Sequence, residues 1–147
     1  MWVVHKAAQV KNLDEARRDL QDTAFDLSKK TFAYAQPPPM EQCDGDAVSS
    51  FTRDTDRTVA IVDMKCRGMV VMSEAASPGW SASVDGKPAP IYPAYTLLRG
   101  VVVNAGRHRI ETRYRPLSVT AGWIATLSAF ASALLFCLSP LLKRKSA

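Results

Sequence analysis

No charged residue lies between Arg115 and Lys143, and this gap constrains the fold more than any other feature of the chain. Within it, residues 118–142 form a run of 25 apolar and small side chains. A helix of that length would extend roughly 37 Å, enough to cross a hydrocarbon core about 30 Å thick. The alternative, a buried helix of a soluble protein, normally carries a polar stripe, and this run has none. We therefore predict one transmembrane helix over 118–142, with the lipid bilayer as a partner.

The charges in the rest of the chain are nearly balanced. All 14 acidic residues and 16 of the 19 Lys and Arg residues lie in residues 1–117, and the other three form a basic tail at 143–147. Much of the high isoelectric point, 9.3, therefore comes from the tail, and we expect no nucleic-acid partner. A composition of 47% hydrophobic and 22% charged residues is typical of one folded domain and excludes a disordered or collagen-like chain.

The basic tail predicts an orientation in the membrane. Cytoplasmic flanks of membrane helices are enriched in Lys and Arg, so residues 143–147 should face the cytoplasm and residues 1–117 the opposite side. Residues 1–6, however, lack the apolar core of a signal peptide. Two interpretations remain: a tail-anchored protein with a cytoplasmic domain, or the end of a longer membrane protein.

Small residues inside the predicted span favour the second interpretation. Ala121, Ala125, Ala129 and Ala133 recur every four residues, so they lie on one face of the helix. Small side chains let helices approach closely, and we expect other transmembrane helices of a larger protein to pack here. The alternative is that alanine is merely tolerated in lipid.

Residues 1–36 are predicted to form a lead-in of mixed secondary structure. Asn12 can cap a following helix, and Glu15 three residues later completes a capping-box pattern. The expected elements are a strand over 2–5, a short helix over 13–21 with Leu13, Ala16 and Leu20 on one face, and a strand over 31–34. Residues 37–45 should be an extended connector, because three successive prolines cannot belong to a helix or a central strand.

Residues 46–117 have the period of two that is typical of β-strands. Asp85 and Gly86 between two such segments are a strong hairpin signal, and a turn is also expected at Gly106. Strands are expected over 59–64, 68–73, 80–84, 87–92, 97–103 and 107–115. Short antiparallel strands with closely spaced turns predict a mainly β chain, an antiparallel β-sandwich followed by the transmembrane helix.

The last strand alternates most clearly. His108, Ile110, Thr112 and Tyr114 share one face, and the opposite face of residues 107–115 carries four arginines and a glutamate. One face should pack on the core. The arginine face could contact lipid phosphates, or it could simply be solvated.

Three cysteines and two histidines are the main candidates for site chemistry. Cys137 lies in the predicted span, whereas Cys43 and Cys66 flank an expected hairpin and could form a disulfide outside the cytoplasm. The sequence shows no Cys-x-x-Cys motif and no Cys/His cluster, so no metal site is predicted. No nucleophile motif or nucleotide-binding fingerprint is present either, so we predict no catalytic constellation and no cofactor in these residues.

Residues 66–140 carry several short motifs in a characteristic order. An apolar strand is followed by Pro-Gly-Trp, Val-Asp-Gly, an Ala-Gly-x-His turn and a Tyr-x-Pro exit into the apolar run. This order resembles the C-terminal region of YfhO-type bacterial membrane proteins, although Asn104 stands where that family more often has proline. The motif residues are Pro78, Gly79, Trp80, Asp85, Gly86, Gly106, His108, Tyr114 and Pro116.

The resemblance implies a function and a location. YfhO-type proteins have many spans and resemble GT-C glycosyltransferases, which take sugars from polyprenyl-phosphate carriers. The implied role is glycosylation of cell-envelope polymers at the bacterial inner (cytoplasmic) membrane, with residues 1–117 outside the cytoplasm. The family's acidic motif would lie in membrane loops that this chain does not include, so no catalytic residue is transferred and enzyme activity of these residues stays open.

The implied role makes envelope glycan a candidate partner of this chain. Trp80, Tyr92 and Tyr95 are the aromatic residues that could stack on sugar rings. The alternative for Trp80 is that it only anchors the core. The chain could therefore be an accessory domain with its last membrane helix, or a stand-alone membrane-anchored carbohydrate-binding or structural module.

Overall fold

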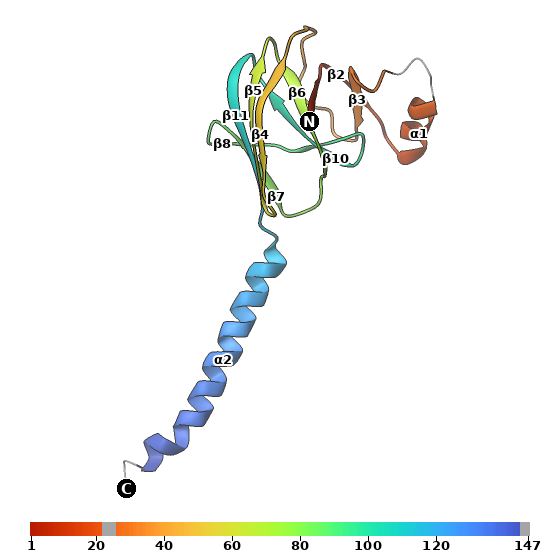
Figure 1. Ribbon diagram of the computed structural model, residues 1–147. Coiled ribbons are helices and arrows are strands. Elements are labelled where there is room, and N and C mark those ends of the chain that lie inside the picture. Colours follow the sequence, from red (N-terminus) through yellow and green to blue (C-terminus); the bar gives the residue numbers. More distant parts are fainter. Residues whose placement is uncertain (22–25, 145–147) are drawn as a thin grey trace. The chain divides into compact units, whose positions relative to one another are not determined.

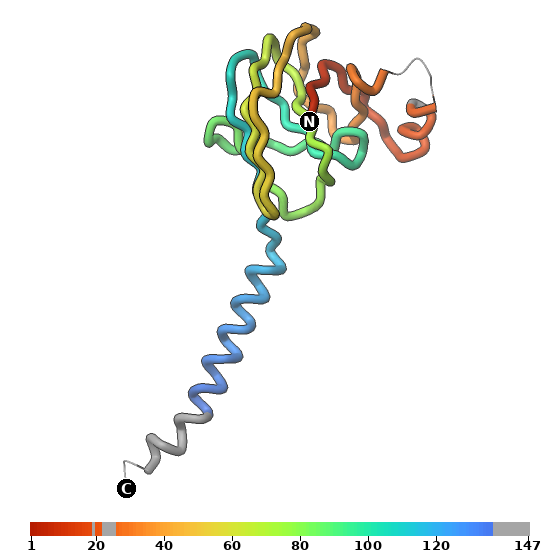
Figure 2. Tube along the Cα trace, viewed as in Figure 1, coloured from red at the N-terminus to blue at the C-terminus, as the bar shows by residue number. Residues whose placement is uncertain are grey.

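The computed structural model describes residues 1–21 and 26–144, with the side chains of Asp19 and residues 137–144 excepted (Figures 1 and 2). The chain divides into two compact units, Met1–Tyr114 and Arg115–Ala147. The first unit is mainly β, and the second contains one helix. In chain order the elements are β1 (Trp2–Val4), β2 (Lys6–Gln9), α1 (Leu13–Gln21), β3 (Lys30–Ala33), β4 (Ala47–Arg53), β5 (Arg57–Met64), β6 (Gly68–Ala75), β7 (Trp80–Val84), β8 (Lys87–Ala89), β9 (Tyr92–Ala94), β10 (Leu98–Val103), β11 (Gly106–Tyr114) and α2 (Leu117–Arg144).

A four-stranded antiparallel sheet has the strand order β1-β6-β10-β9. Its centre is the apolar run of β6, where Val70 lies opposite both Val3 and Val101. The first five residues of β6 are buried. Alternate side chains enter two different hydrophobic clusters, one through Val70 and the other through Val71. The strand expected over 68–73 is therefore confirmed, and it lies inside the sheet with both of its faces buried.

A five-stranded antiparallel sheet has the order β4-β5-β11-β7-β8, and Figure 1 shows β4, β5 and β11 side by side. In β11, Ile110 and Thr112 are fully buried, whereas Arg109 and Arg113 are exposed. The predicted alternation is therefore confirmed over 109–113. Tyr114, which was expected on the packed face, is 37% exposed. β5 alternates in the same way, and every second residue is buried.

Both sheets contribute side chains to one hydrophobic core. Each buried aliphatic side chain contributes about 1.5–3 kcal/mol, so this cluster is a main source of stability. Its buried members are Val62, Met64, Val70, Met72, Ala82, Val101, Val103 and Ile110.

The lead-in differs from the prediction in how it joins the fold. β1 pairs with β6, so residues 1–36 do not stand apart from residues 46–117. Backbone hydrogen bonds to a distant strand place the N-terminus in the four-stranded sheet, and local sequence carries no signal for such a pairing. β2, which was not predicted, pairs in parallel with β3.

Helix α1 has the predicted bounds and cap. Asn12 Oδ1 accepts the N–H of Glu15 at 2.9 Å, and Glu15 Oε2 accepts the N–H of Lys11 at 2.8 Å. Only part of the expected apolar face packs against the rest of the fold. Ala16 is buried, whereas Leu13 and Leu20 are more than half exposed. The helix is too short, and the cluster it joins too small, to cover three positions.

The prediction of a single return strand over 87–92 is wrong. The structure divides it into β8, which pairs with β7, and β9, which pairs with β10 in the other sheet. Pro90 lies at the division. Because proline has no N–H to donate, it interrupts a ladder and allows the chain to change sheets.

Helix α2 begins three residues after β11 ends, immediately after Pro116. Its segment Leu117–Phe136 has a mean hydropathy of 1.7, and this is the one helix among the described residues that is long and apolar enough to cross a membrane. The hydroxyls of Thr126, Ser128 and Ser132 donate to helix carbonyls, each at 2.9 Å. Such bonds satisfy hydroxyls without water.

Candidate functional site

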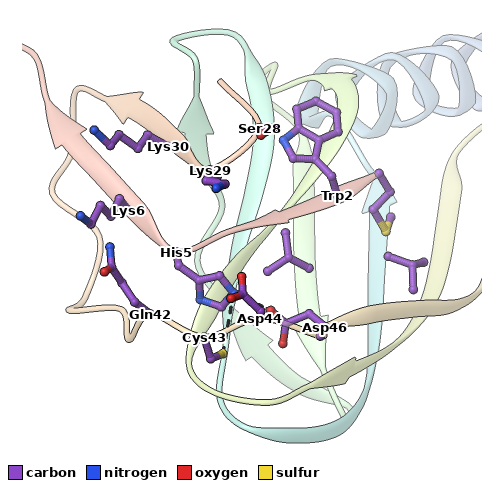
Figure 3. A pocket seen from close by; sticks show the side chains of 14 residues that line it. Trp2, His5, Lys6, Ser28, Lys29, Lys30, Gln42, Cys43, Asp44 and Asp46 are labelled. Atoms are coloured by element: carbon purple, nitrogen blue, oxygen red, sulfur yellow. Dashed lines mark hydrogen bonds and ion pairs between the residues drawn. The ribbon is translucent and has the colours of Figure 1, made fainter. Parts of the chain in front are cut away.

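A pocket of about 780 Å³ opens beside the junction of β1 and β2 (Figure 3). In this view the side chains of Lys6, Lys29 and Lys30 gather on one side, and His5 and Cys43 lie on the other. The pocket therefore combines basic groups with an imidazole and a sulfur atom. Among the described residues, His5, Cys43 and Cys66 are the one group of three potential metal-ligating side chains that lie this close together.

His5 is held firmly in this pocket. Its Nε2 lies 2.5 Å from Oδ2 of Asp46, and the two side chains are only 14% and 6% exposed. The other carboxylate oxygen of Asp46 accepts the backbone N–H of Lys65 at 2.6 Å. The far side of the ring is close to Gly68, where an added Cβ would lie 2.7 Å from Cε1 of His5. Glycine at 68 thus leaves room for the imidazole.

The disulfide candidates are joined in the structure. Cys43 and Cys66 have an S–S distance of 2.06 Å, with Cα atoms 6.2 Å apart. A backbone bond from Glu41 to the carbonyl of Arg67, 2.9 Å long, runs beside the disulfide. Together they fasten the proline-rich connector to the turn between β5 and β6.

The same two sulfur atoms contact His5. Nδ1 of His5 is 3.7 Å from Sγ of Cys66, and Nε2 is 4.0 Å from Sγ of Cys43. One ligand atom from each residue lies within 4.8 Å of the others. This Cys/His cluster was not predicted from the sequence, because positions 5, 43 and 66 are far apart in the chain. Only the placement of β1 beside β6 brings them together.

A second polar cluster surrounds Arg99 on β10, which is only 1% exposed. Its guanidinium forms an ion pair with Glu74 and donates from Nη1 to Oγ1 of Thr112 at 3.0 Å. The guanidinium carbon lies 3.6 Å from the centre of the Trp80 ring. Burial, with a smaller effect of the positive charge on Arg53, lowers the pKa of Arg99 to about 10. The guanidinium therefore stays charged at neutral pH. No local sequence signal predicts the burial of Arg99.

The three aromatic candidates for sugar contact are not brought together. Trp80 lies on β7 of the five-stranded sheet, and its ring packs 5.1 Å from that of Tyr114. Tyr92, on β9 of the four-stranded sheet, and Tyr95 pack instead against a second hydrophobic cluster. The buried members of that cluster are Val4, Met69, Val71 and Ala94. All three side chains are partly buried.

Tyr95 in particular is fixed on both its ring and its hydroxyl. The ring lies 5.5 Å from Phe32 in an edge arrangement. The hydroxyl is within hydrogen-bond distance of the carbonyls of Leu27 at 2.5 Å and Lys30 at 3.0 Å. Burial raises the pKa of the Tyr95 hydroxyl. This tyrosine connects the segment before β3 to the main fold.

The motif residues Asp85 and Gly86 form the predicted hairpin turn. Their φ angles, 52° and 79°, are the left-handed values that a tight two-residue turn requires. Asp85 Oδ1 accepts the backbone N–H of Arg109 at 2.8 Å, and Oδ2 lies 2.6 Å from Nδ1 of His108. These bonds lower the pKa of Asp85 and raise the pKa of His108. The turn is thus tied to the start of β11, where Gly106 also has a positive φ of 122°.

The other motif residues mark the ends of strands. Gly79 has a positive φ of 100° in the turn before Trp80, directly after Pro78. Tyr114 is the last residue of β11, and Pro116 immediately precedes α2. All of these positions have a structural reason that needs no ligand.

The arginine face of β11 is partly neutralised within the sheet. Glu111 receives two bonds of 3.0 Å from Arg57 and also pairs with Arg113 and Arg109. The bonds from Arg57 and then Arg113 lower the pKa of Glu111 to about 2. Of the two interpretations for this face, the pairing favours a solvated surface.

Comparisons with known protein families, with curated proteins and with solved structures find no match for this chain. The described chain offers an apolar helix directly after a β-rich unit, a pocket beside a disulfide, and aromatic residues that are occupied in packing.

Proposed function

We propose that the chain is the C-terminal extracytoplasmic accessory domain, with the last membrane helix, of a bacterial membrane protein similar to the YfhO type. Its role would be in the glycosylation of cell-envelope polymers from polyprenyl-phosphate sugars, with the catalytic part in other spans. One observation carries the proposal: the apolar segment Leu117–Phe136 follows the last strand after only two residues. A linker this short keeps the β-rich unit within reach of the membrane surface.

The proposed architecture is a β-sandwich. Its support is the core that both antiparallel sheets share, with Val70 and Val101 from one sheet and Val62 and Ile110 from the other. A sandwich closes such a core between the inner faces of its sheets.

The proposed orientation places the β-rich unit outside the inner membrane. The disulfide between Cys43 and Cys66 supports this side, since disulfides persist in oxidising compartments. The basic residues at 143–147 support a cytoplasmic C-terminus.

Within this role, a structural function of the β-rich unit is better supported than sugar binding. Sugar recognition by stacking needs an exposed aromatic face, but the ring of Trp80 has Arg99 3.6 Å from its centre and Tyr114 beside it. Tyr95 is held by Phe32 and two carbonyls. We therefore infer a domain that stabilises or orients the outer part of a membrane enzyme, in preference to a stand-alone carbohydrate-binding module.

The orientation is tested at the native locus with two epitopes. One is inserted in the turn between β4 and β5, at Thr55, and the other follows Ala147. Protease added to intact spheroplasts should remove the first epitope and leave the second, and both should disappear after lysis. Protection of the first and loss of the second would reverse the proposed orientation.

The glycosylation role is tested separately. Deletion of the β-rich unit, with α2 kept in place, should lower the sugar content of the envelope polymer. Unchanged polymer glycosylation together with a correct membrane orientation would reject the role and leave a membrane-anchored structural module.

A further inference from the structure

The site around His5 has the chemistry of a metal centre. Two cysteine sulfurs and one imidazole nitrogen lie within 4.8 Å of one another. Thiolate and imidazole are the ligands that Zn²⁺ prefers. The pocket of Figure 3 reaches Cys43, so a small ion can approach from solvent.

The hydrogen bond of His5 decides which nitrogen is available. With Nε2 2.5 Å from the carboxylate of Asp46, Nε2–H donates and Nδ1 keeps its lone pair. Nδ1 is the nitrogen that lies 3.7 Å from Sγ of Cys66. A carboxylate that orients a histidine in this way is the usual outer partner of a zinc ligand.

The position of the ring is also fixed sterically. Because a Cβ at Gly68 would overlap Cε1 and Nδ1 of His5, the imidazole can pack directly on the backbone of β6. Asp46 itself is held by the backbone N–H of Lys65. The imidazole is therefore positioned before any ion binds.

We propose that Cys43, Cys66 and His5 Nδ1 bind a zinc-type divalent cation when the disulfide is reduced, with Asp46 as the positioning residue. A water molecule from the pocket would complete a tetrahedral site. The proposal concerns these residues alone and does not depend on the glycosylation role.

The disulfide and the metal are alternative states of the same residues. A dithiol reductant supplies two electrons and two protons, becoming a disulfide itself, and leaves two thiols at Cys43 and Cys66. Each thiol then releases its proton as its sulfur binds the cation. In the oxidised state the sulfurs share a bond and have no thiolate charge, so the cation cannot be held.

The test uses the full chain in detergent micelles, with Cys137→Ser to remove the third thiol. The protein is reduced with a phosphine under nitrogen and titrated with Co²⁺. We expect thiolate-to-cobalt charge-transfer absorption and tetrahedral d–d bands that saturate at one ion per chain and disappear on addition of Zn²⁺. The oxidised protein should show neither signal.

The Co²⁺ affinities of four variants distinguish a preorganised three-ligand site from nonspecific binding to thiols. Cys66→Ser should abolish the charge-transfer signal, and His5→Ala should weaken Co²⁺ binding at least as much as loss of the orienting carboxylate. Asp46→Asn and Gly68→Ala keep all three ligands but disturb the imidazole, and Asp46→Asn should weaken binding by roughly 10- to 100-fold. The matched control is His108→Ala, which removes the other histidine and should leave binding unchanged.

Circular dichroism of every reduced variant shows whether it is folded. Co²⁺ binding by the oxidised and the reduced chain with all three ligands intact can be compared even if a substituted variant fails to fold. A reduced chain that gives no tetrahedral thiolate–cobalt spectrum would overturn the proposal. Binding of equal strength in Asp46→Asn, Gly68→Ala and the control would overturn it as well.

Discussion

The guanidinium carbon of Arg99 lies 3.6 Å from the centre of the Trp80 ring, and the two residues belong to different sheets. A cation over an indole face contributes about 2 kcal/mol when both groups are desolvated. The same guanidinium reaches Thr112 on β11, so the buried charge connects β10 with two strands of the five-stranded sheet. Tyr114 packs on Trp80 three residues before α2 begins. The cluster therefore includes the last residue of the β-rich unit.

Replacement of Glu74 should strongly destabilise the domain. Glu74→Gln leaves the buried Arg99 without its countercharge, and breaking a buried pair typically costs about 3–5 kcal/mol. Urea unfolding of the full chain in micelles, followed by tryptophan fluorescence, measures the loss.

The matched control is a substitution of Arg53, the second ion-pair partner of Glu74. Arg53 is 65% exposed, so Arg53→Ala should change the unfolding free energy by at most about 1 kcal/mol. Equal effects of the two substitutions would show that the charge on Arg99 is not effectively buried.

Stability should fall at high pH through His108. The bond to Asp85 raises the pKa of His108 above 6.5, so its contribution is fully present below pH 6.5 and is lost as pH rises through the folded-state pKa. NMR titration should give a pKa for His108 above 6.5, and His108→Gln should remove this part of the pH dependence. A pKa at or below 6.5 would contradict the pairing seen in the structure.

Stability should also fall at low pH through Glu111. Its pKa is lowered to about 2 by Arg57 and Arg113, so its contribution is present above its unfolded pKa of about 4.5 and is lost as pH falls toward 2. Glu111→Gln should flatten the unfolding free energy between pH 5 and pH 2, as measured by urea unfolding. A profile identical to that of the unsubstituted chain would argue against these ion pairs.

Loss of the Tyr95 hydroxyl should weaken the attachment of the lead-in. Tyr95→Phe leaves the carbonyls of Leu27 and Lys30 without this donor, which should cost about 1–2 kcal/mol in urea unfolding. Amide hydrogen exchange should increase most in residues 26–33. Binding of envelope glycan, if any is measured, should not change; a loss of glycan binding in a folded variant would instead favour the carbohydrate-binding alternative.

Removal of the disulfide should cost roughly 3 kcal/mol in the loop-entropy account, because Cys43 and Cys66 are 23 residues apart. The double substitution to serine, compared with the unsubstituted chain in urea, measures this loss. Thiol labelling of the unreduced, unfolded chain should modify Cys137 alone. Labelling of Cys43 and Cys66 would show that the pair is not oxidised.

Local signals in the sequence were sufficient for several elements. The Asp85 and Gly86 turn follows from the need for positive φ, the cap of α1 from Asn12 and Glu15, and the alternation of β11 from its period of two. The division of 87–92 between two sheets was not predicted, because a proline shows where a ladder breaks but not which strand the chain joins next.

The sequence was sufficient for only part of the candidate site. A disulfide between Cys43 and Cys66 could be proposed because both lie in the predicted outer domain. The contact of His5 with both sulfurs could not be predicted, since it depends on β1 lying beside β6. The burial of Arg99 was equally hidden, because an arginine in a strand normally faces water.

By itself, the sequence determined the long apolar helix, the β-rich character of the remainder and the main turns, because these depend on hydrophobic period and on local backbone preference. The tertiary structure alone decided that the N-terminal strand enters the four-stranded sheet, that Arg99 is buried against Trp80, and that His5 meets the disulfide. Those three features are contacts between distant segments, and their free energy depends on packing partners that no local pattern specifies.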